Sequence, residues 1–308
     1  MRKKRKRGRK MSALVSLCTG KLQHKYGDMP ALEIAKASGA DAVDFNLIEN
    51  SSAKSDNIYA RSDEEIVAYY ERVRQKAESL GLIIGQTHGR IKGFRNIAAE
   101  DERLVKDARI DCLATATLKA PVCVMHSATS IFFGPDVDPQ FMRDLNFDMF
   151  TRILPFARQY DVKVATETFG DATGRSCLDF FGDIREFLMS YHRVCAVEDF
   201  KKYFTICVDT GHSNKATRYG QPSAGDVLRM CGGDVTVLHL NDNDTLTDQH
   251  KPPLSGSLDW KDIMKALKEI GYKGIYNMEV NLAFFGEALC EDTAAFSVKI
   301  MKSLLAQQ

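Results

Sequence analysis

Hydrophobic positions follow two alternating patterns along the chain from residue 12 onward. Short runs rich in β-branched residues, such as 162–167 and 235–240, alternate with longer segments in which apolar residues recur every three or four positions. The first pattern is typical of buried strands and the second of amphipathic helices. Their regular alternation predicts repeated β-α units arranged on a parallel sheet.

Eight such units can be counted in the sequence. The predicted strands cover 13–18, 42–46, 82–88, 122–126, 162–167, 203–209, 235–240 and 274–279. The predicted helices lie near 29–39, 63–80, 100–119, 141–160, 181–200, 223–232, 260–270 and 286–306. Helix 63–80 has the clearest signals, because Ser62 and Glu65 form a capping box and Gly81 ends the helix. Asp259 is the predicted N-cap of the helix that Gly271 ends.

Eight β-α units predict an α/β fold, a (β/α)8 TIM barrel, as a single domain over residues 12–308. The alternative is a doubly wound open sheet, which a glycine-rich phosphate-binding sequence after the first strand would favour. Residues 16–20 (SLCTG) do not provide that sequence. Residues 1–10 (MRKKRKRGRK) cannot bury apolar surface, so we expect residues 1–11 to form a disordered basic tail.

Composition and charge exclude several classes of protein. The 308 residues are 44% hydrophobic and 27% charged, which is ordinary for a globular protein. Neither a run of 18 apolar residues nor an apolar stretch after the basic start is present, so we expect a cytoplasmic protein without membrane contact. Residues 1–10 hold eight of the 42 basic residues, which leaves 34 against 41 acidic residues and a net charge of −7. That charge argues against a nucleic-acid partner.

The eight cysteines include no C-x-x-C pair. We expect them to be reduced and to serve as small core residues, because free cysteine is among the most buried residue types.

Residues able to bind a metal ion recur where the predicted strands end. They are His88, His126, Glu167, Asp209, His212, His239 and Glu279, with Asp248 and His250 in the segment after the seventh strand. In a barrel these strand ends converge on one funnel, where buried carboxylates would be costly unless a cation compensated them. The histidines His24 and His192 lie outside this set, and we expect them to be ordinary surface residues.

The smallest set of metal ligands comprises Glu167, Asp209, His239 and Glu279. Three carboxylates and one imidazole make an oxygen-rich site, which suits Mn²⁺, Mg²⁺ or Co²⁺, and Zn²⁺ accepts the same residue types. Our prediction is one divalent ion, with Mn²⁺ as the first choice.

Three motifs resemble the xylose-isomerase-like barrel superfamily, and within it the sugar phosphate isomerase/epimerase family of AP endonuclease 2 type. Residues 208–212 (VDTGH) are similar to its D-T-x-H motif and residues 239–242 (HLND) to its H-[LI]-x-D motif. Residues 248–260 (DQHKPPLSGSLDW) resemble its D-x-H and P-x-x-G-x-[IL]-D-W stretch. The likeness covers the chain from residue 12 to its end.

The resemblance implies a metal-dependent isomerase or epimerase of a sugar or sugar phosphate that works through a metal-stabilised cis-enediolate. By this likeness the four ligands above hold the metal, and Glu167 and Glu279 exchange roles as general base and general acid. The side chains expected to bind the carbohydrate substrate are His88, His126, His212, Asp248, His250 and Arg175. Thr173 and Thr245 stand near places where ketose 3-epimerases of the family carry a glutamate and an arginine, which argues against a close ketose 3-epimerase.

Several alternatives remain open. Endonuclease IV has the same barrel and holds three zinc ions with nine ligands, and residues of all nine types occur here. The same enolising site could serve a lyase, a dehydratase or an enzyme that cleaves C-glycosides. A third class is a barrel subunit that binds sugars without turnover, and apolar helix faces would allow a homo-oligomer.

Overall fold

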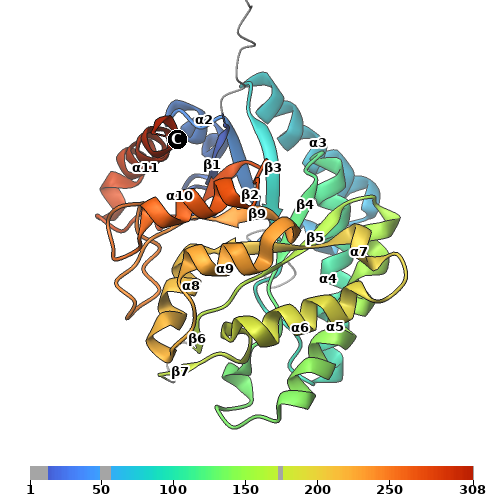
Figure 1. Ribbon diagram of the computed structural model, residues 1–308. Helices are drawn as coiled ribbons and strands as arrows, with labels where there is room; N and C mark the ends of the chain where they lie inside the picture. The colour runs from blue at the N-terminus through green and yellow to red at the C-terminus, as the bar shows by residue number, and fades with distance from the viewer. Residues whose placement is uncertain (1–12, 49–56, 173–175, 308) are drawn as a thin grey trace, which may run out of the picture.

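Eight parallel strands form the centre of the molecule, and helices surround them (Figure 1). The computed structural model describes residues 13–48, 57–172 and 176–307, so the predicted basic tail lies outside the described residues. The strands are β1 (Val15–Cys18), β2 (Ala42–Asn46), β3 (Ile83–His88), β4 (Val122–Met125), β5 (Lys163–Glu167), β8 (Phe204–Asp209), β9 (Val235–His239) and β10 (Tyr276–Met278). They follow the order β10-β1-β2-β3-β4-β5-β8-β9. Leu240, directly after β9, bridges Met278 of β10 in parallel, which brings the two edges of the sheet together.

The helices of the ring follow the strands in turn. They are α1 (Gly20–Tyr26), α2 (Asp28–Ala37), α3 (Asp63–Ser79), α4 (Ala98–Thr117), α5 (Pro139–Gln159), α6 (Ile184–Cys195), α7 (Phe200–Tyr203), α8 (Thr210–Ala216), α9 (Ala224–Cys231), α10 (Trp260–Glu269) and α11 (Cys290–Ala306). Short 3₁₀ turns lie at Ile58–Ala60, Ser130–Phe132, Phe180–Gly182, Thr217–Tyr219, Gly232–Asp234 and Glu287–Leu289. Figure 1 shows α11 beside α2, so the last helix completes the ring next to the first units. The predicted single-domain TIM barrel is confirmed, and the open sheet is excluded.

The helix caps predicted at Ser62 and Asp259 form in the structure. The Ser62 hydroxyl accepts a hydrogen bond from the Glu65 amide, and the Glu65 carboxylate accepts one from the Ser62 amide at 3.1 Å. Asp259 accepts a hydrogen bond from the Asp262 amide at the start of α10. Each cap satisfies backbone donors that a helix start would otherwise leave unpaired.

The prediction was wrong about a few short elements. The single helix expected over 181–200 is two helices, α6 and α7, because Asp199 between them has a left-handed backbone with φ of 68°. The helices α1 and α8 and the antiparallel hairpin of β6 (Asp171–Ala172) and β7 (Cys177–Leu178) were not predicted. Elements of two to seven residues are too short to show a hydrophobic period.

Strand register shifts by one residue at two places beneath the strand ends. Between β2 and β3, Val43 pairs with Ile84 but Asp44 pairs with Gln86. Between β8 and β9 a second shift follows Ile206, and it brings Asp209 opposite His239. Such irregularities re-aim side chains near functional sites, and both lead here to polar residues inside the barrel.

The main hydrophobic core lies between the strands and the surrounding helices. A small separate apolar cluster fills part of the barrel interior and consists of Val122, Val124, Ala165, Cys207 and Val237. The cysteines are free, and six are buried as expected, whereas Cys177 and Cys195 are only half-buried. Within the described ranges, no helix combines the length and apolar character needed to cross a membrane.

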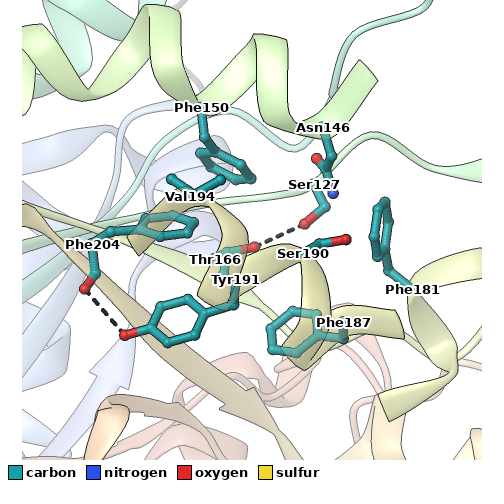
Figure 2. Close-up of a pocket in the computed structure, with 10 residues that line it drawn as sticks. All are labelled: Ser127, Asn146, Phe150, Thr166, Phe181, Phe187, Ser190, Tyr191, Val194 and Phe204. Atoms are coloured by element: carbon teal, nitrogen blue, oxygen red, sulfur yellow. Dashed lines mark hydrogen bonds between the residues drawn. The ribbon is translucent and has the colours of Figure 1, made fainter. Parts of the chain in front are cut away.

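A small cavity lies between α5, α6 and the strands (Figure 2). Its polar side carries Ser127, whose hydroxyl shares a 2.8 Å hydrogen bond with Thr166, and its apolar side carries Phe150, Phe181 and Phe187. The volume of about 10 Å³ has room for about one water molecule. This cavity is therefore a packing feature of the core and is too small for a substrate.

Candidate metal centre

Four strands end on a side chain that can bind a metal ion. They are β3 at His88, β5 at Glu167, β8 at Asp209 and β9 at His239, and Glu279 follows the end of β10. Because parallel strands in a barrel end at the same face, these groups converge although almost 200 residues of sequence separate them. His126 comes directly after β4 and joins the same face.

The four predicted metal ligands meet at one point. One candidate ligand atom from each of Glu167, Asp209, His239 and Glu279 lies within 4.8 Å of every other. The Nδ1 atom of His239 is 3.1 Å from Oε1 of Glu167 and 3.2 Å from Oε2 of Glu279. Three of these side chains are completely buried, and Glu279 keeps 20% of its side chain exposed. The arrangement has one side open to an incoming molecule.

The hydrogen-bond pattern of Glu167 indicates a cation. Nitrogens of four histidines lie 3.0 to 3.8 Å from its two oxygens. Even so, neither oxygen of this buried carboxylate forms a hydrogen bond to any described residue, and the same holds for Nδ1 of His239. Buried polar atoms of native proteins are nearly always paired, so these atoms together fit the donor set of a divalent metal ion.

Asp209 is held in place by its neighbours. Its Oδ1 accepts a hydrogen bond of 2.6 Å from the His212 amide, because Asp209 is the N-cap of α8. Its Oδ2 accepts a hydrogen bond of 2.8 Å from the side-chain amide of Asn241. A carboxylate fixed in this way offers its remaining lone pairs in one direction, as metal ligands usually do.

Electrostatics keep Glu167 and His239 in opposite charge states. Burial opposes ionisation of Glu167, but His239 and His126 outweigh it and hold the pKa of Glu167 well below its usual range. Burial likewise opposes a charge on His239, yet Cys207, Glu167 and Glu279 raise its pKa well above the usual range. A metal ion would replace the positive charge of this imidazolium, since metal ligands must lose their protons.

The other predicted site residues surround this centre. His88 Nε2 lies 3.6 Å from Glu279 Oε1, and His126 Nε2 lies 3.0 Å from Glu167 Oε2. His88 is fully buried, and burial lowers its pKa, so its ring is neutral at pH 7. His126 is only half-buried and sits farther toward solvent.

His212, Asp248 and His250 form a second group on the open side. Oδ2 of Asp248 lies 3.5 Å from Nε2 of both histidines. Burial disfavours the charged form of His250, but the hydrogen bond to Asp248 and the carboxylate of Glu279 raise its pKa to about 10. Burial opposes the charge on His212 too, and Asp209 and Asp248 raise its pKa well above the usual range. The structure thus brings together every predicted site residue that it describes, whereas Arg175 and Thr173 lie outside the described residues.

A pocket of about 460 Å³ lies beside the centre. It is lined by Cys18, Gly20, Lys21, His24, Asn46, Ile48, Asp248, His250, Glu279, Val280 and Asn281. His24 lies on the surface of α1, as expected, and it borders the same pocket as Glu279. Thr245, by contrast, is a half-buried residue of the loop after β9.

The segment after β9 is fixed by Asp242. This buried carboxylate accepts a hydrogen bond of 2.8 Å from the indole of Trp260 and others from the amides of Asn243 and Leu258. The Asp242 and Lys251 backbones also form an antiparallel bridge. Trp260 is buried and packs under this loop, which presents Asp248 and His250 to the centre.

Sequence reasoning missed two charged residues next to the centre. Asp44 lies in the middle of β2 and is fully buried, with its Oδ2 3.3 Å from Nε2 of His239. Lys215 on α8 is buried with its Nζ 2.6 Å from Oδ1 of Asp171 and 3.7 Å from Oδ1 of Asp248. The sequence did contain a signal for each residue. Asp44 is a charged residue inside an otherwise apolar strand, and Lys215 is a lysine shortly after a strand end.

Comparisons with known proteins agree with this architecture. The family model described as xylose isomerase-like TIM barrel matches residues 32–296. The uncharacterized protein MJ1311 of Methanocaldococcus jannaschii is 26% identical over 194 residues, which are 60% of this chain and 60% of that protein. The D-psicose 3-epimerase of Enterocloster bolteae is 24% identical over 250 residues, covering 77% of this chain and 73% of the epimerase. A crystal structure of a D-tagatose 3-epimerase-like protein superposes with a TM-score of 0.70 at 18% identity, covering 96% of this chain and 97% of that one.

Proposed function

Because this chain belongs to the xylose isomerase-like TIM barrel family, we propose that it is a divalent-metal-dependent isomerase or epimerase acting on a small carbohydrate. The observation that carries the proposal is the buried carboxylate of Glu167. Its oxygens lack hydrogen bonds from the described residues, and Glu167 and Glu279 both face Nδ1 of His239. Two of the similar proteins are named as a D-psicose 3-epimerase and a D-tagatose 3-epimerase-like protein, which supports the same class of reaction.

Glu167, Asp209, His239 and Glu279 would hold the metal ion in this proposal. When bound, the ion supplies positive charge next to the substrate oxygens, where negative charge develops as a proton leaves the adjacent carbon. Three carboxylates favour Mn²⁺, with Mg²⁺, Co²⁺ and Zn²⁺ as alternatives.

Two carboxylates of the centre would transfer the proton. Glu167 is buried inside the barrel, and Glu279 borders the open pocket, so a carbon held between them can lose a proton to one and regain it from the other. His88, His126, His212, Asp248 and His250 would hold the substrate hydroxyl groups. The high pKa values of His212 and His250 make both rings hydrogen-bond donors at neutral pH.

Proton exchange with solvent provides a test that does not require the substrate to be known in advance. The Mn²⁺-loaded protein would be incubated in D₂O with a panel of free and phosphorylated ketoses and aldoses, and the C–H proton next to each carbonyl followed by NMR. We expect exchange in at least one sugar with wild-type protein and loss of that exchange with Glu167→Gln. Product analysis of the active sugar then separates epimerisation from dehydration or C-glycoside cleavage, which start with the same proton removal. Absence of exchange across the panel with fully metal-loaded protein would contradict the proposal.

The second candidate function is a trinuclear zinc nuclease of the endonuclease IV type. Two further groups favour it, since His88, His126 and Glu167 form one possible metal site and Asp209, His212 and His250 form another. Lys215 argues against it, because its buried ammonium group already supplies a positive charge 3.7 Å from Asp248, a residue that the third zinc would need. Elemental analysis separates the two: one metal ion per chain supports the isomerase, and three zinc ions support the nuclease.

A further inference from the structure

Asp44 is a fully buried carboxylate in the interior of the barrel, beneath the candidate metal centre. It lies in the middle of β2, where its neighbours Val43 and Phe45 belong to the main apolar core. A buried carboxylate is costly unless it is paired and hydrogen-bonded. The contacts of Asp44 therefore indicate what the residue does.

One oxygen of Asp44 meets polar groups from three other strands. Oδ2 accepts hydrogen bonds from the side-chain amides of Gln86 on β3 at 3.0 Å and Asn277 on β10 at 3.1 Å. The same oxygen is 3.3 Å from Nε2 of His239 on β9. The register shift between β2 and β3 places Gln86 directly opposite Asp44, so the pairing of the two strands brings these side chains into contact.

The ring of His239 is consequently constrained on two edges and one face. Asp44 contacts Nε2, while Glu167 and Glu279 approach Nδ1 on the opposite edge. The ring of His88 stacks on its face with a centroid distance of 5.1 Å. A carboxylate acceptor at Nε2 keeps the proton on that nitrogen, which leaves the lone pair of a neutral ring on Nδ1.

We propose that Asp44 is a positioning residue that fixes the tautomer and orientation of His239, so that Nδ1 is the atom that binds the metal ion. This inference rests on the proposed function. It adds a fourth carboxylate to the centre, one that acts through His239 and touches neither metal nor substrate. Carboxylates in that position typically change metal affinity by about 10- to 100-fold when they are removed.

The test measures metal binding directly. Full-length wild-type protein, Asp44→Asn and Asp44→Ala would be titrated with Mn²⁺ and followed by electron paramagnetic resonance, and the visible absorption spectrum of each Co²⁺ complex would be recorded. Asparagine has the same shape, and its oxygen can still accept the hydrogen bonds from Gln86 and Asn277, so this variant removes the charge with little disturbance of packing. We expect Asp44→Asn to weaken Mn²⁺ binding about 10-fold and to change the Co²⁺ spectrum, and Asp44→Ala to weaken binding about 100-fold.

Asp111→Asn serves as the matched control. Asp111 is equally buried and is hydrogen-bonded to the Tyr59 hydroxyl, but none of its contacts described by the structure reaches the four candidate ligands. We expect its Mn²⁺ affinity and Co²⁺ spectrum to equal those of wild type. A Mn²⁺ affinity of folded Asp44→Asn within twofold of wild type, with an unchanged Co²⁺ spectrum, would overturn the role of Asp44. If wild-type protein itself binds no divalent ion, the proposed function fails instead, so the two failures are distinguishable.

Discussion

The imidazole rings of His88 and His239 stack with their centroids 5.1 Å apart and their planes within 10° of parallel. Nδ1 of His88 lies 3.2 Å from the Gly89 carbonyl oxygen, and burial keeps the ring neutral by lowering its pKa. Donation from Nδ1 to that carbonyl leaves an unshared electron pair on Nε2, which faces Glu167 and Glu279. His88 can therefore accept a hydrogen bond from a substrate hydroxyl at the centre.

Replacing His88 with alanine should lower kcat/KM by roughly 10- to 100-fold, which corresponds to the loss of one hydrogen bond in a site rich in charge. Metal content should stay at one ion per chain, because His88 is not among the four proposed ligands. Steady-state kinetics and elemental analysis on the same preparation check both statements. His192→Ala is the matched control, since this histidine is exposed and far from the strand ends. A drop in metal content with His88→Ala would instead assign His88 to a second metal ion.

Glu167→Gln and Glu279→Gln should each reduce turnover by at least about 100-fold, the lower range for positioned acid–base catalysis. Glutamine keeps an oxygen for the metal but cannot accept the substrate proton. Turnover would be measured at saturating Mn²⁺, so that weaker metal binding does not account for the loss. Glu102→Gln changes an exposed glutamate paired with Arg152 and should behave as wild type. Near-normal turnover in both active-site variants would rule out their role in proton transfer.

The barrel and its strand-end residues could be predicted from the sequence because both depend on local pattern. Strand periodicity places Glu167, Asp209 and His239 at strand ends, and the barrel geometry then brings those ends together without further information. The buried interior is different. Asp44 binds side chains from three strands that are distant in sequence, and its partner Gln86 is brought opposite by a one-residue register shift that no local pattern reports.

Lys215 illustrates the same limit. In the sequence it is an ordinary lysine in a polar stretch, and short helices such as α8 carry no clear hydrophobic period. It becomes a buried cation only because the β6–β7 hairpin supplies Asp171 and the loop after β9 supplies Asp248. Such contacts follow from tertiary structure alone.

Removal of the metal ion should destabilise the protein as well as inactivate it. Binding of an ion at 100 times its dissociation constant stabilises a folded protein by about 2.7 kcal/mol, which shifts the melting temperature of a chain of this size by roughly 4 °C. Differential scanning calorimetry before and after chelation, and again after Mn²⁺ is restored, checks this. Asp209→Asn should lack the shift, because asparagine can still cap α8 but is a poorer metal ligand. An equal shift in wild type and Asp209→Asn would exclude Asp209 as a ligand.

Asp111 should make the protein less stable as pH rises from about 4 to 6. Burial raises the pKa of this carboxyl to about 6 in the folded protein, despite the opposing effect of Arg90. The folded state then binds more protons than the unfolded state between the two pKa values, so the free energy of unfolding falls across that interval by roughly 3 kcal/mol. The loss is complete above pH 6 and absent below pH 4.

Asp111→Asn removes this titration, and its amide oxygen can still accept the hydrogen bond from Tyr59. The stability of the variant relative to wild type should therefore increase between pH 4.5 and 7.5. Urea unfolding of both proteins at both pH values gives the difference between their free energies of unfolding. The other titrating groups contribute equally to the two proteins, so their contributions cancel in this difference. A constant difference between the two proteins would show that Asp111 has an ordinary pKa.

Lys215 should contribute to stability mainly through its buried ion pair with Asp171. Its side chain is 4% exposed, and methionine in its place would leave the largely buried Asp171 carboxylate without its cation, whereas Asp248 would keep His212 and His250. Loss of one partner of a buried ion pair costs about 3 to 5 kcal/mol, so Lys215→Met should unfold at markedly lower denaturant concentration.

The double variant Lys215→Met/Asp171→Asn should recover part of that loss, because it removes the charge that lies nearest to Lys215. A double-mutant cycle measures the coupling between the two residues, which should exceed about 1 kcal/mol. Strictly additive effects would show that the hairpin and α8 are held together by packing, with no net contribution from this ion pair.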